Sequence, residues 1–135
     1  MQNNYLCPHC RSYIGIMNNI IFTVKSDVKK WKGILLLNSE LGNYTHLLHP
    51  SIKIEEGEII DFFCPVCGAD LTATGINISL ARIIMTDKDS KEFDVYFSKI
   101  CGEHSTFLIQ KDNIIERYGK ESSSYVNYFM SRLKK

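Results

Sequence analysis

The chain has 135 residues, of which 44% are hydrophobic and 23% charged, as expected of one globular domain covering residues 1–135. Its formal net charge of +1 argues against a surface built mainly to bind nucleic acid. No apolar run is long enough to span a bilayer, and the start, "MQNNYLCPHC", lacks the basic and apolar stretches of a secretory signal, so we expect a cytoplasmic protein without a membrane partner.

The first half of the chain has the pattern of β-hairpins. Residues 20–24 and 34–37 are rich in β-formers and flank a polar stretch that contains Gly33, which predicts two paired strands. The segment "IKIEEGEIIDFFC" predicts a second strand–turn–strand unit that bends at Glu56-Gly57.

The second half continues the β pattern. The segments "GINISLARIIMTD" and "KEFDVYFSKI" predict two strands joined by the polar turn "DKDSK". Phe93, Val95 and Phe97 alternate with more polar residues, which indicates a strand with one buried face. The segments "STFLIQ" and "NIIERYG" predict a further hairpin across Lys111-Asp112.

The C-terminal segment has helical periodicity instead. Val126, Phe129, Met130 and Leu133 fall on one stripe, so we predict an amphipathic helix over about 122–134 that packs on the protein's own sheet. The expected fold is therefore mainly β, with antiparallel sheets, a zinc-ribbon-like pair of Cys-x-x-Cys knuckles and one C-terminal helix.

The two Cys-x-x-Cys motifs, "CPHC" and "CPVC", are the most specific signal in the sequence. In a reducing compartment, cysteines at this spacing are more often metal ligands than disulfides, and structural zinc takes four tetrahedral ligands. We predict one four-thiolate Zn²⁺ site that staples the N-terminal segment to the middle of the sheet. Its ligands are Cys7, Cys10, Cys64 and Cys67.

The residues around the cysteines fit such knuckles. Pro8 and Pro65 fix φ and remove an amide that would need a partner, and Gly68 permits a positive φ where the chain leaves the second motif. Arg11 occupies the matching place in the first motif, where a positive φ would cost about 1 kcal/mol.

"CGEH" leaves other arrangements open. Cys101 and His104 could replace the first motif as partners of the second, or form a separate open site completed by His46 or His49. An open site would activate water and make the protein a zinc-dependent enzyme. The plainer interpretation is that Cys101 is a core residue and His104 lies in a loop. A third possibility is that one Cys-x-x-Cys motif is a thiol redox pair, but such pairs are expected between a strand and a helix.

"KSDVKKWKG" surrounds the single tryptophan with lysines. An exposed Trp31 could stack on a nucleobase while Lys29, Lys30 and Lys32 contact phosphates. The alternative is an ordinary hairpin turn with solvated lysines and the indole folded onto the sheet.

Several segments together resemble a family of small bacterial proteins with zinc-ribbon-type cysteine pairs and no settled activity. They are "LCPHC", "LGNY", "GEIIDFFCPVCG", "FSKICGEHSTF" and "IERYG". The resemblance covers most of the chain and implies a fold type and a metal but no reaction. We expect a binding or adaptor module that is stabilised by structural zinc and has a protein partner. The alternative is the zinc-dependent enzyme described above, with an open metal site near Cys101 and His104.

Overall fold

The computed structural model describes residues 3–111 and 113–133, and the side chains of 131–133 are outside that description. It contains two antiparallel five-stranded sheets, here called sheet A and sheet B. Sheet A has the strand order β1-β7-β8-β9-β10. Its strands are β1 (Asn4–Leu6), β7 (Leu80–Thr86), β8 (Glu92–Ser98), β9 (Thr106–Gln110) and β10 (Asn113–Tyr118).

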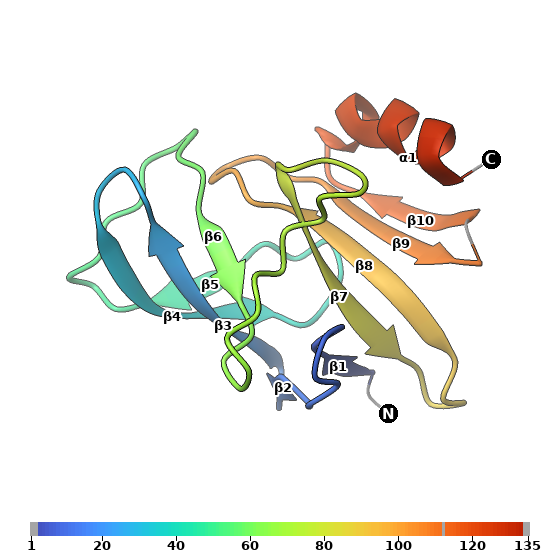
Figure 1. The fold of residues 1–135 in the computed structure, drawn as a ribbon, viewed down its shortest axis with the longest axis horizontal. Helices are drawn as coiled ribbons and strands as arrows, with labels where there is room; N and C mark the ends of the chain where they lie inside the picture. The colour runs from blue at the N-terminus through green and yellow to red at the C-terminus, as the bar shows by residue number, and fades with distance from the viewer. Residues whose placement is uncertain (1–2, 112, 134–135) are drawn as a thin grey trace.

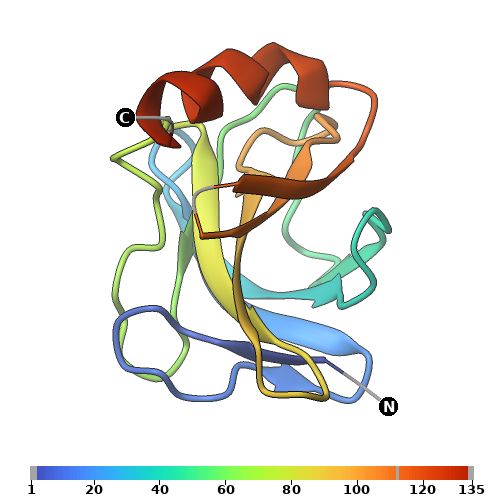
Figure 2. The same cartoon turned by 90° about the vertical axis from the view of Figure 1, so that its right-hand side faces the viewer.

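Sheet B has the order β2-β3-β4-β5, and β6 pairs with β3 beyond the stretch that β2 occupies. Its strands are β2 (Gly15–Ile16), β3 (Asn19–Ser26), β4 (Trp31–Asn38), β5 (His46–Leu48) and β6 (Asp61–Phe63). Figures 1 and 2 show the two sheets set at an angle, with the N-terminal strand β1 at the edge of sheet A and the other early strands in sheet B.

The predicted mainly β, antiparallel fold is confirmed. The hairpins β3–β4, β7–β8 and β9–β10 form at the expected places, and the predicted bend at Glu56-Gly57 is a turn in which Gly57 has φ +89°. One strand prediction is wrong, because residues 52–55 belong to no strand and only the second half of that unit pairs, as β6. Asp112, in the predicted last turn, lies outside the described residues.

The main core lies between the two sheets. Phe22 of β3, Phe62 of β6 and Phe97 of β8 form an aromatic triangle with ring centroids 5.1–5.5 Å apart. All three rings are buried, so residues from both sheets share one apolar interior. Burial of aromatic side chains of this size is a major source of stability.

The C-terminal segment covers the opposite face of sheet A, as Figure 1 shows in red. A 3₁₀ turn (Ser122–Tyr125) leads into α1 (Val126–Leu133). Phe129 is fully buried and packs against Tyr96 of β8 and Phe107 of β9, so packing of the helix on its own sheet is confirmed.

The buried face of this helix differs in detail from the predicted stripe. Tyr125 and Phe129 are buried, Val126 is half-buried, and Met130 is 36% exposed. The 3₁₀ turn brings Tyr125 inward ahead of the α-helix, and the side chain of Leu133 lies outside the described residues. Within the described part of the chain, α1 and the other helical turn are too short to cross a membrane.

Candidate metal centre

The two Cys-x-x-Cys motifs fold into knuckles with the same backbone pattern. Each follows a short strand, β1 before Cys7 and β6 before Cys64. The amide of the first cysteine donates to the carbonyl five residues later, and its own carbonyl accepts from the amide four residues later. Isolated bridges then close both hairpins, between Leu6 and Tyr13 and between Phe63 and Asp70.

The residue after the second cysteine leaves each knuckle with a positive φ. Gly68 has φ +79°, which glycine adopts without strain. Arg11 has φ +60°, so the first knuckle bears the predicted left-handed cost of about 1 kcal/mol. The same turn is therefore built from two different residues, and only the glycine would be recognised from sequence as suited to it.

The four cysteines come together, although the two motifs are far apart in the sequence. All four sulfur atoms lie within 4.8 Å of one another. Cys7 Sγ is 3.8 Å from Cys67 Sγ, and Cys10 Sγ is 3.8 Å from Cys64 Sγ. A regular tetrahedron of sulfurs at the usual Zn–S distance of about 2.3 Å has edges of about 3.8 Å. The cluster thus has the spacing of the ligands of one tetrahedral ion.

Backbone amides donate hydrogen bonds to the sulfur of the first cysteine in each knuckle. Cys7 Sγ accepts from the amides of His9 and Cys10, at 3.2 and 3.4 Å, and Cys64 Sγ accepts from those of Val66 and Cys67, both at 3.3 Å. Such N–H groups stabilise thiolate charge. In each knuckle these N–H groups would stabilise the thiolate once a bound cation favours its ionisation.

Each knuckle also has one buried and one exposed cysteine. Cys7 and Cys64 are buried, whereas Cys10 and Cys67 are exposed. Burial raises the pKa of the Cys7 thiol to about 12, while hydrogen bonds from the side chain and backbone of Ser12 lower the pKa of Cys10 to about 6. A buried thiol that resists ionisation needs a nearby cation to become a thiolate. A bound metal ion would supply that charge.

The knuckles lie where the chain crosses between the sheets. The first knuckle is entered from β1 in sheet A and leads to β2 in sheet B. The second is entered from β6 in sheet B and leads to Thr72, which bridges to Ala81 in sheet A. An ion held by both would tie the two crossings together. We predicted a staple between the N-terminus and the middle of one sheet, but the cysteine cluster lies between two sheets.

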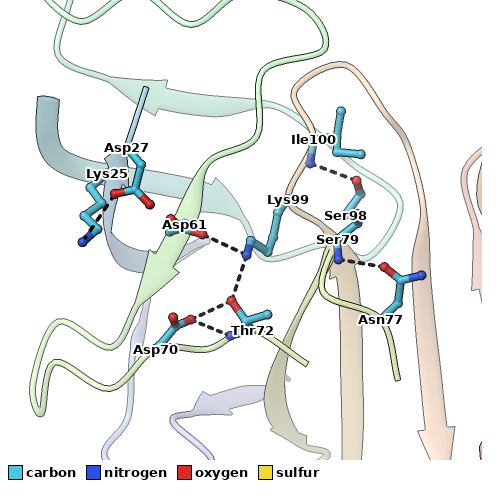
Figure 3. A network of polar contacts seen from close by, with 10 residues as sticks. All are labelled: Lys25, Asp27, Asp61, Asp70, Thr72, Asn77, Ser79, Ser98, Lys99 and Ile100. Atoms are coloured by element: carbon cyan, nitrogen blue, oxygen red, sulfur yellow. Dashed lines mark hydrogen bonds and ion pairs between the residues drawn. The ribbon is translucent and has the colours of Figure 1, made fainter. Parts of the chain in front are cut away.

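A polar network braces the segments before and after the second knuckle (Figure 3). Lys99 Nζ lies 2.9 Å from the Asp61 carboxylate and donates to Thr72 Oγ1 at 2.8 Å. Asp70 accepts in turn from the hydroxyl and amide of Thr72, at 2.7 and 2.9 Å. Because Lys99 directly follows β8 of sheet A and is only 5% exposed, this ion pair fixes β6 against that sheet. Sequence reasoning missed it, since nothing local marks a lysine as buried.

Cys101 and His104 do not join the cysteine cluster. Among the described residues, the four clustered cysteines are the only group of three or more Cys, His, Asp or Glu ligand atoms close enough to hold one ion. The alternative in which Cys101 and His104 replace the first motif is therefore not formed. The His104 ring stacks on Tyr44 with ring centroids 4.3 Å apart. His46 Nδ1, at the start of β5, lies 3.4 Å from the Tyr44 carbonyl oxygen, and His49 Nδ1 lies 2.7 Å from Ser51 Oγ. This is the plainer interpretation given above.

The lysine-rich turn is less open than the nucleic-acid hypothesis requires. Trp31 is half-buried against the main core, and its Nε1 atom is buried. Lys29 lies 3.4 Å from Glu58 and 3.6 Å from Glu55. The indole is thus folded onto the sheet, and part of the basic charge is neutralised by carboxylates of the same protein.

Comparison of the chain with protein-family models, with curated proteins and with solved structures found no match. The resemblance to small bacterial zinc-ribbon proteins therefore stays a prediction, and the site is interpreted from its own geometry.

Proposed function

We propose that the protein is a binding or adaptor module whose fold is stabilised by one structural Zn²⁺ ion on the four clustered cysteines. The observation that carries this proposal is the sulfur geometry, with cross-knuckle distances of 3.8 Å. Four thiolates complete the coordination of zinc and leave no position for water, so such an ion would be structural and not catalytic. All four sulfurs would be ionised in the loaded protein.

The outer face of sheet B supports a protein partner. On β4 the buried Leu35 alternates with outward residues, so Ile34 and Leu36 lie on the side away from the core. Leu36 pairs with Leu47 of β5 and with Ile21 of β3, and Ile34 and Leu47 are 52% and 60% exposed. Neighbouring exposed apolar side chains of this kind are typical of protein-binding surfaces.

The metal half of the proposal is tested by measuring the zinc content of the purified chain. We expect one zinc per chain, an unchanged ratio in Cys101→Ser, and a strong loss in Cys64→Ser. Zinc retained equally by both variants would rule out the four-cysteine site. Cobalt substitution provides a second measurement, because tetrahedral thiolate ligation gives characteristic charge-transfer bands that Cys101→Ser should keep.

The partner half is tested by site-specific photocrosslinking in cells. A crosslinking residue at Leu47, on the apolar face, should capture a discrete protein, and one at Ile78, which is 71% exposed and lies outside both sheets, should not. Equal capture at both positions would contradict a partner on sheet B.

Nucleic-acid binding through the lysine turn is the competing partner class. It is measured by fluorescence anisotropy with single- and double-stranded RNA and DNA at low salt. Lys30→Glu/Lys32→Glu would be compared with Lys88→Glu/Lys91→Glu as a charge-matched control. Binding that only the first pair abolishes would replace a protein partner with a nucleic acid.

A further inference from the structure

The two sheets do not fill the space between them. A cavity of about 260 Å³, partly open to solvent, reaches into the interior that they share. Apolar side chains from both sheets line it, each at most 7% exposed: Ile20, Leu35 and Phe62 from sheet B, and Ile83, Val95 and Phe97 from sheet A. These walls are side chains of the hydrophobic core, and residues 40–44 and 99–104 contribute much of the remaining lining.

The size of this space is unusual for a packed interior. Protein cores reach the density of organic crystals, and voids larger than a water molecule are few. An apolar cavity of about 150 Å³ stays dry and binds benzene. By proportion, this cavity accommodates a molecule of about the bulk of two fused aromatic rings. Apolar cavities of this kind, with a few polar groups at the entrance, are typical ligand sites.

The charged groups around the cavity indicate which ligands would fit. The carboxylate and ammonium groups that line it are those of Glu40, Glu103 and Lys99, and the other ionisable side chains of the lining are Tyr44, His46, Cys101 and His104. Lys99 is paired with Asp61 at 2.9 Å. Glu103 accepts hydrogen bonds from the hydroxyls of Ser98, at 2.7 Å, and Tyr125. Two carboxylates and one neutralised ammonium favour an uncharged ligand and disfavour an anion such as a fatty acid.

We propose that the cavity between the sheets binds a neutral, mainly apolar small molecule of about the bulk of two fused rings. The site is separate from the cysteine cluster and does not depend on the identity of the metal. Its walls are contributed by both sheets, so a bound ligand would bridge them at a second place. Cys101, which also lines the cavity and is partly exposed, provides a thiol for monitoring occupancy.

The test titrates the full-length protein with 2-naphthol and with 2-naphthoate, which share a ring system and differ in charge. Methyl-labelled NMR spectra would follow Ile83 and Val95 inside the cavity and the exposed Ile78 as an internal control. We expect 2-naphthol to shift the cavity methyl signals and leave Ile78 unchanged, with 2-naphthoate binding at least about tenfold more weakly. Equal affinities would overturn the neutral-ligand assignment, and unchanged cavity methyl signals would overturn the site.

A pair of matched variants tests the location. Val95→Phe adds bulk to the cavity wall and should weaken 2-naphthol binding about tenfold or more, whereas Ile78→Phe adds the same ring type outside it and should bind as the unmodified protein does. Unchanged affinity in a folded Val95→Phe would contradict the proposal.

A second measurement needs no substitution in the wall, in case Val95→Phe does not fold. Bound 2-naphthol should slow the reaction of Cys101 with a thiol reagent, and a Cys101→Ser control identifies that thiol's contribution. Because burial raises the pKa of Cys101, the reaction is best followed in mildly alkaline buffer. A Cys101 reaction rate that 2-naphthol leaves unchanged would overturn the proposed site.

Discussion

The Cys64→Ser substitution distinguishes between two interpretations of the cysteine cluster, a shared metal centre and a set of packed thiols without a metal. Cys64 is 1% exposed and is one of the four clustered sulfurs. Structural zinc contributes an apparent ~10–16 kcal/mol to folding in small modules, so each of four thiolates accounts for about 2.5–4 kcal/mol. For a domain of this size, that loss lowers the melting temperature by roughly 8–20 °C. Cys101→Ser, outside the cluster, should cost about 1 kcal/mol or less.

Thermal unfolding with and without a strong chelator is the assay. The unmodified protein and Cys101→Ser should both lose the full zinc contribution in chelator, whereas Cys64→Ser should already be destabilised and should lose less in chelator than they do. Three equal melting temperatures, or equal chelator effects in all three proteins, would exclude a shared metal centre that includes Cys64. So would an unmodified protein that keeps its melting temperature after its metal is shown to be gone.

Three further tests measure the free energy of unfolding by chemical denaturation, one at the ion pair beside the second knuckle and two elsewhere in the fold. Lys99→Met should lower the free energy of unfolding by about 2 kcal/mol, because it leaves the partly buried Asp61 unpaired. The double variant with Asp61→Leu should recover part of that loss. Additive losses from the two substitutions would show that the pair is not coupled. Gly119→Ala should lower the free energy of unfolding by about 3 kcal/mol, because the new Cβ would lie 2.0 Å from a backbone carbonyl oxygen and φ is +94°. Gly57→Ala, with a similar φ of +89° but open space around the new Cβ, should lower it by only about 1 kcal/mol. Similar losses in the two variants would exclude the steric clash. Phe129→Ala should lower the free energy of unfolding by about 3–5 kcal/mol without changing the metal content. A loss of metal would contradict the separation of the cluster under the C-terminal helix from the main core.

The strands and the cysteine cluster were predictable from sequence because their signals are local. Period-two alternation in Phe93, Val95 and Phe97 marked the face of β8 that packs in the main core, and the knuckle spacing predicted that the four cysteines would come together. The prediction of a single buried face was wrong, because Tyr96 on the other face of β8 is buried under the C-terminal helix. The segment 52–55 was misassigned because an alternating pattern cannot show whether a partner strand exists. The buried face of the C-terminal helix was shifted by a 3₁₀ turn that its periodicity does not reveal.

Long-range features were not predictable from sequence. The ion pair of Lys99 with Asp61, the crossing of the chain between sheets at each knuckle, and the cavity all depend on segments that meet only in the folded protein. Cavity-lining residues such as Leu35 and Val95 carry the same hydrophobic signal as any core residue. Whether their side chains fill the interior is decided by the spacing of two sheets, which a hydrophobic pattern does not encode.

X-ray absorption at the zinc edge of the purified protein is the most direct test of the shared metal centre. We expect a first coordination shell of four sulfur atoms at about 2.3 Å and no oxygen or nitrogen ligand. A shell with fewer sulfurs, or one containing water or imidazole, would contradict a single ion held by both knuckles.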